Sequence, residues 1–132
     1  MTIKSYKELD VWKKAITIVD QIYLLTSKLP KDEQYILAAH MRRSAISIPS
    51  NIAEGFSRGH TPEYIQLLRI ALGSLAELET QFTIADRRGY INGDAINGLP
   101  DNIDHEARML MNLIKCLEKK KKSCSRTRTT NH

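Results

Sequence analysis

The chain has 132 residues, of which 42% are hydrophobic, and a formal net charge of +5. This length provides one domain, which buries roughly two-thirds of the surface that the unfolded chain exposes. No apolar run approaches the ~20 residues that span a bilayer, no segment resembles a signal peptide, and two cysteines make no disulfide framework, so we expect a cytoplasmic protein with no membrane partner.

The first half of the chain predicts two long helices. Apolar residues recur at helical spacing, strand-like alternation is absent, and glycine and proline fall between the periodic segments. We expect a first helix over residues 6–29 and a second over residues 31–58, the latter kinked near Pro49 and ended by Gly59.

The second half predicts two more helices. Thr61, Pro62 and Glu63 provide a cap hydroxyl, a first-turn proline and an acid for a third helix that ends near residue 88. Asn92 caps a fourth, which Pro100 splits into a leading turn and a main body. Because short connections make successive helices antiparallel neighbours, the sequence predicts an all-α, up-and-down antiparallel four-helix bundle over residues 1–118.

The positive charge lies at the C-terminus. Residues 119–132 contain six basic residues and no acid, so residues 1–118 hold the other 14 basic residues and all 15 acids and carry −1. We expect a disordered basic tail over 119–132. It could bind phosphates through counterion release, or be only a solvated terminus.

Two helices are apolar over more of their circumference than a lone bundle needs. On the first helix, two apolar stripes lie on nearly opposite sides, and on the third Gly73 would let another backbone approach. The surplus predicts an oligomer interface, unless one stripe simply covers both neighbouring helices. The candidate interface residues are Val11, Ile18, Ile22, Leu25, Ile70 and Gly73.

Residues 42–55 keep helical apolar spacing through a proline and several small polar residues. Neighbouring hydroxyl and amide groups can satisfy the backbone that Pro49 disrupts, and Glu54 can pair with Arg58 one turn later. This segment is either a kinked core helix with locally satisfied polar groups or a surface shaped for a partner. The residues assigned to the structural polar motif are Ser47, Asn51, Glu54 and Glu77.

Together with its neighbours, this segment resembles a known family, the small four-helix-bundle proteins encoded within intervening sequences of bacterial 23S ribosomal RNA genes. The resemblance covers residues 5 to about 120, and Gly93, Gly98 and Pro100 depart from its plainer final helix. The matching pieces are residues 9–12 with Lys13 and Ala15, residues 29–31 with Glu33, residues 42–55 and residues 71–79.

The resemblance implies a bundle that assembles as a ring-shaped homopentamer. It also implies a likeness in architecture to the accessory protein of diversity-generating retroelements, which binds a reverse transcriptase and nucleic acid. No catalytic residues come with the family, and its role is unsettled.

Catalytic and metal sites are not indicated. No histidine pair has the spacing of a helical zinc site, and no histidine lies three residues after a glutamate, as a di-iron bundle requires. Glu54, Glu77 and Glu79 could form a carboxylate set for a metal, but partial burial of Glu79 with an arginine partner is the better interpretation. We expect no enzyme and no cofactor.

Two functions remain open. The first is an oligomeric scaffold that binds RNA or a ribonucleoprotein, and the second is a protein-binding adaptor or structural scaffold without a nucleic-acid role. The candidate phosphate contacts are Arg42, Arg43, Arg58, Arg69, Lys119, Lys120, Lys121, Lys122, Arg126 and Arg128. The near-neutral body is the feature that separates them, because a nucleic-acid binder usually keeps a basic face, which here only clustering in an assembled ring could restore. We place RNA or ribonucleoprotein binding first and the adaptor as its alternative.

Overall fold

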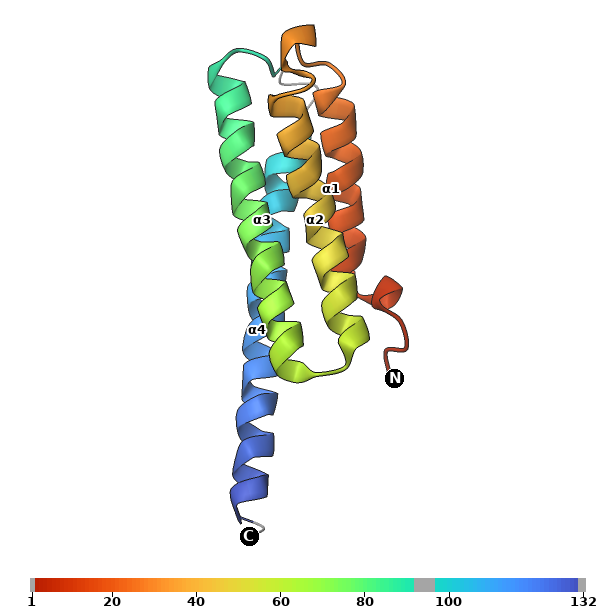
Figure 1. Cartoon of the computed structure of the whole chain (residues 1–132), viewed down its shortest axis with the longest axis vertical. Helices are drawn as coiled ribbons and strands as arrows, with labels where there is room; N and C mark the ends of the chain where they lie inside the picture. Colours follow the sequence, from red (N-terminus) through yellow and green to blue (C-terminus); the bar gives the residue numbers. More distant parts are fainter. Residues whose placement is uncertain (1, 92–96, 131–132) are drawn as a thin grey trace.

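The computed structural model describes residues 2–91 and 97–130, with side chains described up to residue 120. Within these residues the chain forms four α-helices and no strand: α1 (Asp10–Thr26), α2 (Leu37–Arg58), α3 (Thr61–Arg87) and α4 (Leu99–Thr130). The helices run alternately up and down, and each packs against its two neighbours in a closed bundle (Figure 1). The predicted four-helix bundle is therefore observed.

The core runs along the bundle axis and takes one of the two stripes of α1. Four of the residues predicted at an oligomer interface, Val11, Ile18, Ile22 and Leu25, are buried in it. That assignment is wrong, because this stripe packs onto the other three helices of the same chain. Ile70, at 46% exposure, and Gly73 do lie on the surface.

The N-terminal end of the first predicted helix is a separate turn. Ser5 and Glu8 form a reciprocal capping box around the 3-10 turn η1 (Tyr6–Glu8). Leu9 is then extended, and α1 begins only at Asp10. At the other end, α1 stops at Thr26, but Leu29 remains buried in the core.

The connection between α1 and α2 is longer than the sequence predicts. Residues 31–36 form the 3-10 turn η2 (Lys31–Glu33) and an irregular stretch, so α2 starts at Leu37. The Gln34 amide donates hydrogen bonds to the carbonyl oxygens of Thr26, at 2.9 Å, and Leu29, at 3.0 Å. These bonds hold the connection against α1 and satisfy carbonyls at its end.

The ends of the remaining helices are set by glycine and proline. Gly59 and Gly89, with φ of 67° and 75°, follow α2 and α3 as predicted. Thr61 is the first residue of α3 rather than its cap. The expected cap Asn92 lies outside the described residues, and α4 begins at Leu99 with Pro100 in its first turn instead of being split there.

The basic tail predicted for residues 119–132 begins within α4. The backbone of α4 continues as a helix to Thr130, beyond the end of the other three helices (Figure 1). A helix that is already formed is easily extended, and lysine is a good helix former. The basic residues therefore form a helical extension of the bundle.

Gly55 and Gly73 give a matched test of the packing. A Cβ on Gly55 would lie 2.8 Å from Cδ1 of Tyr64 and 3.2 Å from Cβ of Leu67, whereas a Cβ on Gly73 meets nothing within 4 Å. We expect Gly55→Ala to lower the free energy of unfolding by about 1–3 kcal/mol, because overpacking separates α2 from α3. In the isolated protomer, Gly73→Ala should raise it by about 0.5–1 kcal/mol through helix propensity. Urea unfolding of both variants is the measurement, and equal effects would contradict this account.

Candidate functional site

The polar residues around Pro49 tie α2 to itself and to α3. Pro49 has no N–H for the carbonyl of Ala45. The next two carbonyls each accept a side-chain bond, that of Ile46 from Ser50 Oγ at 2.8 Å and that of Ser47 from Asn51 Nδ2 at 2.8 Å. α2 passes through the proline without a break.

Ser47 itself points across the helix contact. Its hydroxyl lies 2.8 Å from the Ser74 hydroxyl on α3 and accepts a second bond from Asn51 Nδ2 at 2.9 Å. The predicted structural role of Ser47 and Asn51 is therefore supported, with Ser74 as a partner that the sequence did not reveal. Glu54 is exposed and bonds Arg58, and Glu77 is exposed.

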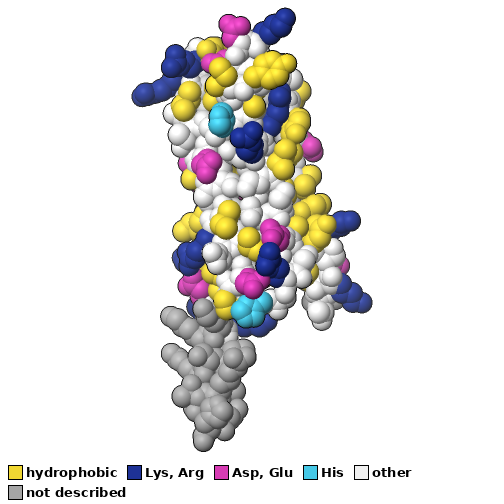
Figure 2. Space-filling view, in the orientation of Figure 1, with side chains coloured by type: hydrophobic (Ala, Val, Ile, Leu, Met, Phe, Trp, Pro, Cys, Tyr) yellow, Lys and Arg dark blue, Asp and Glu magenta, His cyan; other side chains and the backbone are white. Residues whose placement is uncertain are grey.

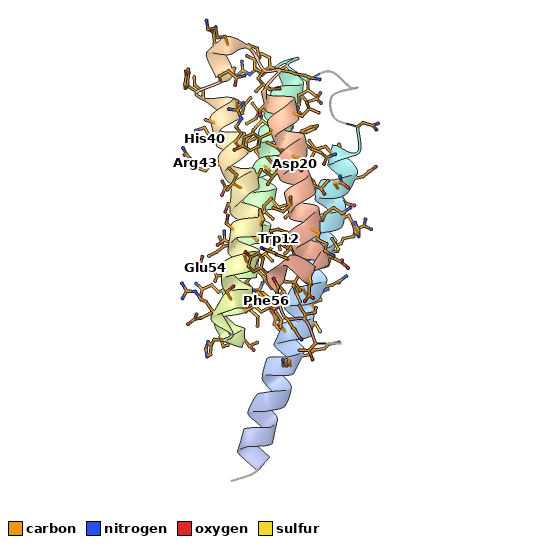
Figure 3. The ribbon with its side chains drawn as sticks, turned by 90° about the vertical axis from the view of Figure 1, so that its right-hand side faces the viewer. Trp12, Asp20, His40, Arg43, Glu54 and Phe56 are labelled. Atoms are coloured by element: carbon orange, nitrogen blue, oxygen red, sulfur yellow. The ribbon has the colours of Figure 1, made fainter. Side chains whose placement is uncertain are left out.

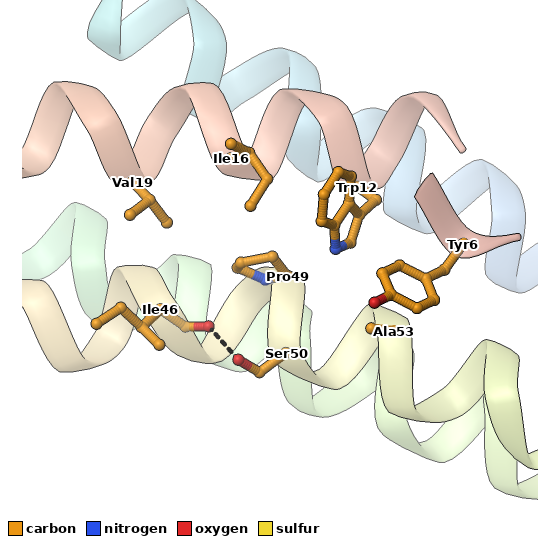
Figure 4. A pocket seen from close by; sticks show the side chains of 8 residues that line it. All are labelled: Tyr6, Trp12, Ile16, Val19, Ile46, Pro49, Ser50 and Ala53. Atoms are coloured by element: carbon orange, nitrogen blue, oxygen red, sulfur yellow. Dashed lines mark hydrogen bonds between the residues drawn. The ribbon is translucent and has the colours of Figure 1, made fainter. Parts of the chain in front are cut away.

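An apolar groove lies on the other side of Pro49, between α1 and α2 (Figure 4). Its volume is about 330 Å³. Tyr6 packs edge-on against Trp12 with ring centroids 5.4 Å apart, so η1 forms one end wall. The groove is lined by Tyr6, Trp12, Ile16, Val19, Ile46, Pro49, Ser50 and Ala53.

Arg42 is part of the fold rather than a free phosphate contact. Its guanidinium donates to Thr26 Oγ1 at 2.9 Å and to Gln34 Oε1 at 3.0 Å. It also lies 5.6 Å from the centre of the Tyr23 ring, within cation–π range. Its prediction as a nucleic-acid contact is not supported, because its donors already hold the α1–α2 connection.

Two more predicted phosphate contacts are engaged by acids. Arg58 bonds Glu54 at 2.7 Å and Glu63 at 3.3 Å, which confirms the predicted Glu54–Arg58 pair. These two carboxylates raise the pKa of Arg58. The guanidinium stays protonated, and its positive charge is balanced by the acids beside it. Arg69 pairs with Glu118 across α3 and α4.

Arg43 differs from these arginines. It is exposed, and it has no ion pair within the described residues. Figure 3 shows His40, Arg43 and Glu54 along the edge of α2 that is turned away from α1. On the face seen in Figure 2, basic and acidic side chains alternate rather than gather.

The remaining predicted contacts lie on the extension of α4. Lys119 and Lys120 are exposed. Lys121, Lys122, Arg126 and Arg128 lie on its helical backbone, and their side chains are outside the described part of the chain.

The acids considered for a metal do not form a cluster. Glu79 is exposed, so its predicted partial burial with an arginine is wrong. Among the described residues, no group of three histidine, cysteine or acidic side chains is placed to hold a metal ion. None of the described helices is long and apolar enough to cross a membrane.

Glu106 is the residue that sequence reasoning missed. It is fully buried, and neither carboxylate oxygen has a hydrogen-bond partner in the part of the chain that the structure describes. Burial raises its pKa to about 8, against a smaller opposing effect of Lys14. Its spacing gave a signal, because it lies three residues after Ile103 and four before Leu110, as an inward-facing residue should.

The family model for 23S rRNA-intervening sequence proteins matches residues 7–112. The chain belongs to this family. No curated protein matches this intervening-sequence protein.

The fold of the family also appears in a solved structure. A protein of unknown function from the S23 ribosomal protein family of Bacteroides thetaiotaomicron is similar, with a TM-score of 0.72 and 24% identity. The match covers 80% of this chain and 95% of that one. At this identity the likeness concerns the fold alone.

The hydrogen bonds among Ser47, Asn51 and Ser74 form a network between α2 and α3. This network predicts unequal effects of two alanine substitutions on α2. Asn51→Ala should lower the free energy of unfolding by about 1–3 kcal/mol, because it leaves partly buried acceptors on Ser47 without their donor. Glu54→Ala should cost under about 0.5 kcal/mol, because its pair with Arg58 is exposed. Denaturant titration of both variants is the measurement. If Asn51→Ala is neutral, the network has no structural role.

Proposed function

We propose that this intervening-sequence protein is a non-enzymatic, oligomeric scaffold that binds RNA or a ribonucleoprotein through the helical extension of α4. The observation that carries the proposal is the position of that extension. Six basic residues and no acid follow Glu118, on a helix that leaves the bundle. An RNA backbone meets concentrated positive charge there, and the contact needs no base-specific geometry.

The arginines of the bundle support the same assignment by elimination. Arg42 holds the α1–α2 connection, and Arg58 and Arg69 are paired with acids. A guanidinium in an ion pair must give up its carboxylate before it can bind phosphate. Arg43 is the one predicted bundle contact that is exposed and has no ion pair among the described residues. A lone arginine supplies little affinity, so the extension dominates.

We further propose that the scaffold is a ring-shaped homopentamer. The surfaces available for it are the groove beside Trp12 and the part of α3 that carries Ile70 and Gly73. Gly73 has no neighbour that would meet a Cβ, yet a glycine inside a helix costs about 0.5–1 kcal/mol relative to alanine. A partner backbone approaching at Gly73 explains that choice. Because the groove and this part of α3 are different surfaces, their pairing is heterologous, and a heterologous contact forms a ring where its rotation closes after five copies.

A protein-binding adaptor is the second candidate, and the groove favours it. Aromatic and aliphatic side chains line the groove, and Ser50 is its most polar wall residue. Such a surface accepts the apolar face of a partner helix. In this function the charged residues contribute only solubility.

Truncation after Glu118 tests the RNA proposal. Full-length protein should bind structured RNA with a salt slope that reflects up to six phosphate contacts per chain, each contributing about −0.7 to −0.9. Truncation should remove most of the affinity and leave the melting temperature unchanged. Filter binding at two salt concentrations is the measurement.

Two full-length variants provide the matched controls. One replaces the six basic residues with glutamine, and the other replaces the four lysines with arginine. The first should bind as weakly as the truncated protein and the second as tightly as the native chain. Arg43→Ser should change affinity little. Unchanged affinity after truncation would place the site on the bundle, and no binding by the native protein at low salt would favour the adaptor.

Light scattering tests the assembly. The native chain should give about five times its monomer mass of 15.1 kDa at micromolar concentration. Ile70→Glu should reduce this mass without changing the helix content, because Ile70 is 46% exposed in the protomer. Thr83→Glu, also on an exposed part of α3, is the control. A monomer mass for the native chain would refute the ring.

A further inference from the structure

Glu106 occupies the centre of the inward face of α4. Ile103, Leu110 and Ile114 on the same face are buried in the core, and Glu106 lies among them with 0% exposure. Among the described residues, neither of its oxygens has a hydrogen-bond partner. An ionised carboxylate without a partner is strongly disfavoured in such a place, so the packed structure requires the neutral acid.

Few charged groups face this carboxyl. From α1, Lys14 acts on it, but the Lys14 ammonium donates to Asn102 Oδ1 at 3.2 Å, one turn away. None of the buried residues of α3 is charged, and Arg69 pairs with Glu118, twelve residues further along α4 than Glu106. The neighbours on α4 itself, Asp104, His105 and Arg108, are exposed.

The attachment of α4 to the bundle depends on the same face. α4 packs against α1 and α3 through its apolar stripe. A short polar chain joins it to α1, because Asn102 Nδ2 donates to Gln21 Oε1 at 2.9 Å and Gln21 Nε2 donates to the carbonyl of Asn97 at 3.3 Å. A negative charge in the middle of this stripe would therefore weaken the packing of α4 against α1 and α3.

We propose that Glu106 is a proton-controlled latch: α4 stays docked while this carboxyl is neutral and detaches from α1 and α3 when it ionises. Detachment brings the carboxylate into water, where its charge is solvated. α2 and α3 keep their own contact through Gly55 and the Ser47–Ser74 bond, so they stay packed.

The direction of the pH dependence follows from linkage. In the docked state burial raises the pKa of Glu106 to about 8, whereas in the detached state it returns to the ordinary value of 4.5. Between these two values the detached state releases a proton that the docked state holds. The opening constant of α4 therefore rises about tenfold per pH unit in this window, and it levels off above about pH 8.

Hydrogen exchange of the full-length protein, read by mass spectrometry from pH 5.5 to 8.5, tests the latch. After correction for the intrinsic exchange rate, amides of residues 101–114 should lose protection about tenfold per pH unit. Amides in the α2–α3 contact should keep theirs. Glu106→Gln should make the protection of α4 independent of pH, and Glu106→Leu should do the same if the glutamine variant does not fold.

Two controls separate the latch from general pH effects. Glu79→Gln removes an exposed acid and should leave the pH dependence intact. Lys14→Met should extend the dependence to higher pH, because Lys14 lowers the pKa of Glu106. Parallel loss of protection in all four helices, or protection of α4 that is constant with pH in the native chain, would overturn the proposal.

Discussion

Small side chains along the contact between α2 and α3 let the two backbones approach closely, and the rest of the bundle is built around that approach. Gly55 lies against Tyr64 and Leu67, where a Cβ would not fit without a shift. Further along, the hydroxyls of Ser47 and Ser74 meet at 2.8 Å. With these two helices fixed, α1 and α4 complete the core from the opposite side.

Pro49 gives α2 two different faces. On the side of α3, Asn51 and Ser47 satisfy the polar groups near the proline. On the side of α1, the proline ring helps to form a groove whose walls are mostly apolar. This segment is a satisfied core helix on the side of α3, and on the side of α1 it carries an apolar groove.

The basic residues also fall into two groups, one within the bundle and one on the extension of α4. Within the bundle, arginines are used to hold the fold together, at the α1–α2 connection and between α3 and α4. Beyond the bundle, six basic residues and no acid follow Glu118 on the extension of α4. Because α4 also carries Glu106, any change in its docking would move the helix that bears the basic extension.

The sequence by itself determined the number of helices, the end of α2, both ends of α3, the Glu54–Arg58 pair and the family. These features are local, because glycine conformations, proline positions and i to i+4 spacing act within a few residues. Only the tertiary structure decided which stripe of α1 is the core, that Arg42 and Arg69 are engaged, and that Glu106 is buried. Helical periodicity gives the direction of a side chain around its own axis, but not what the neighbouring helices place there. Ile18 and Glu106 are examples. Ile18 was assigned to an oligomer interface and Glu106 was overlooked in the heptad pattern, yet both are buried in the same core.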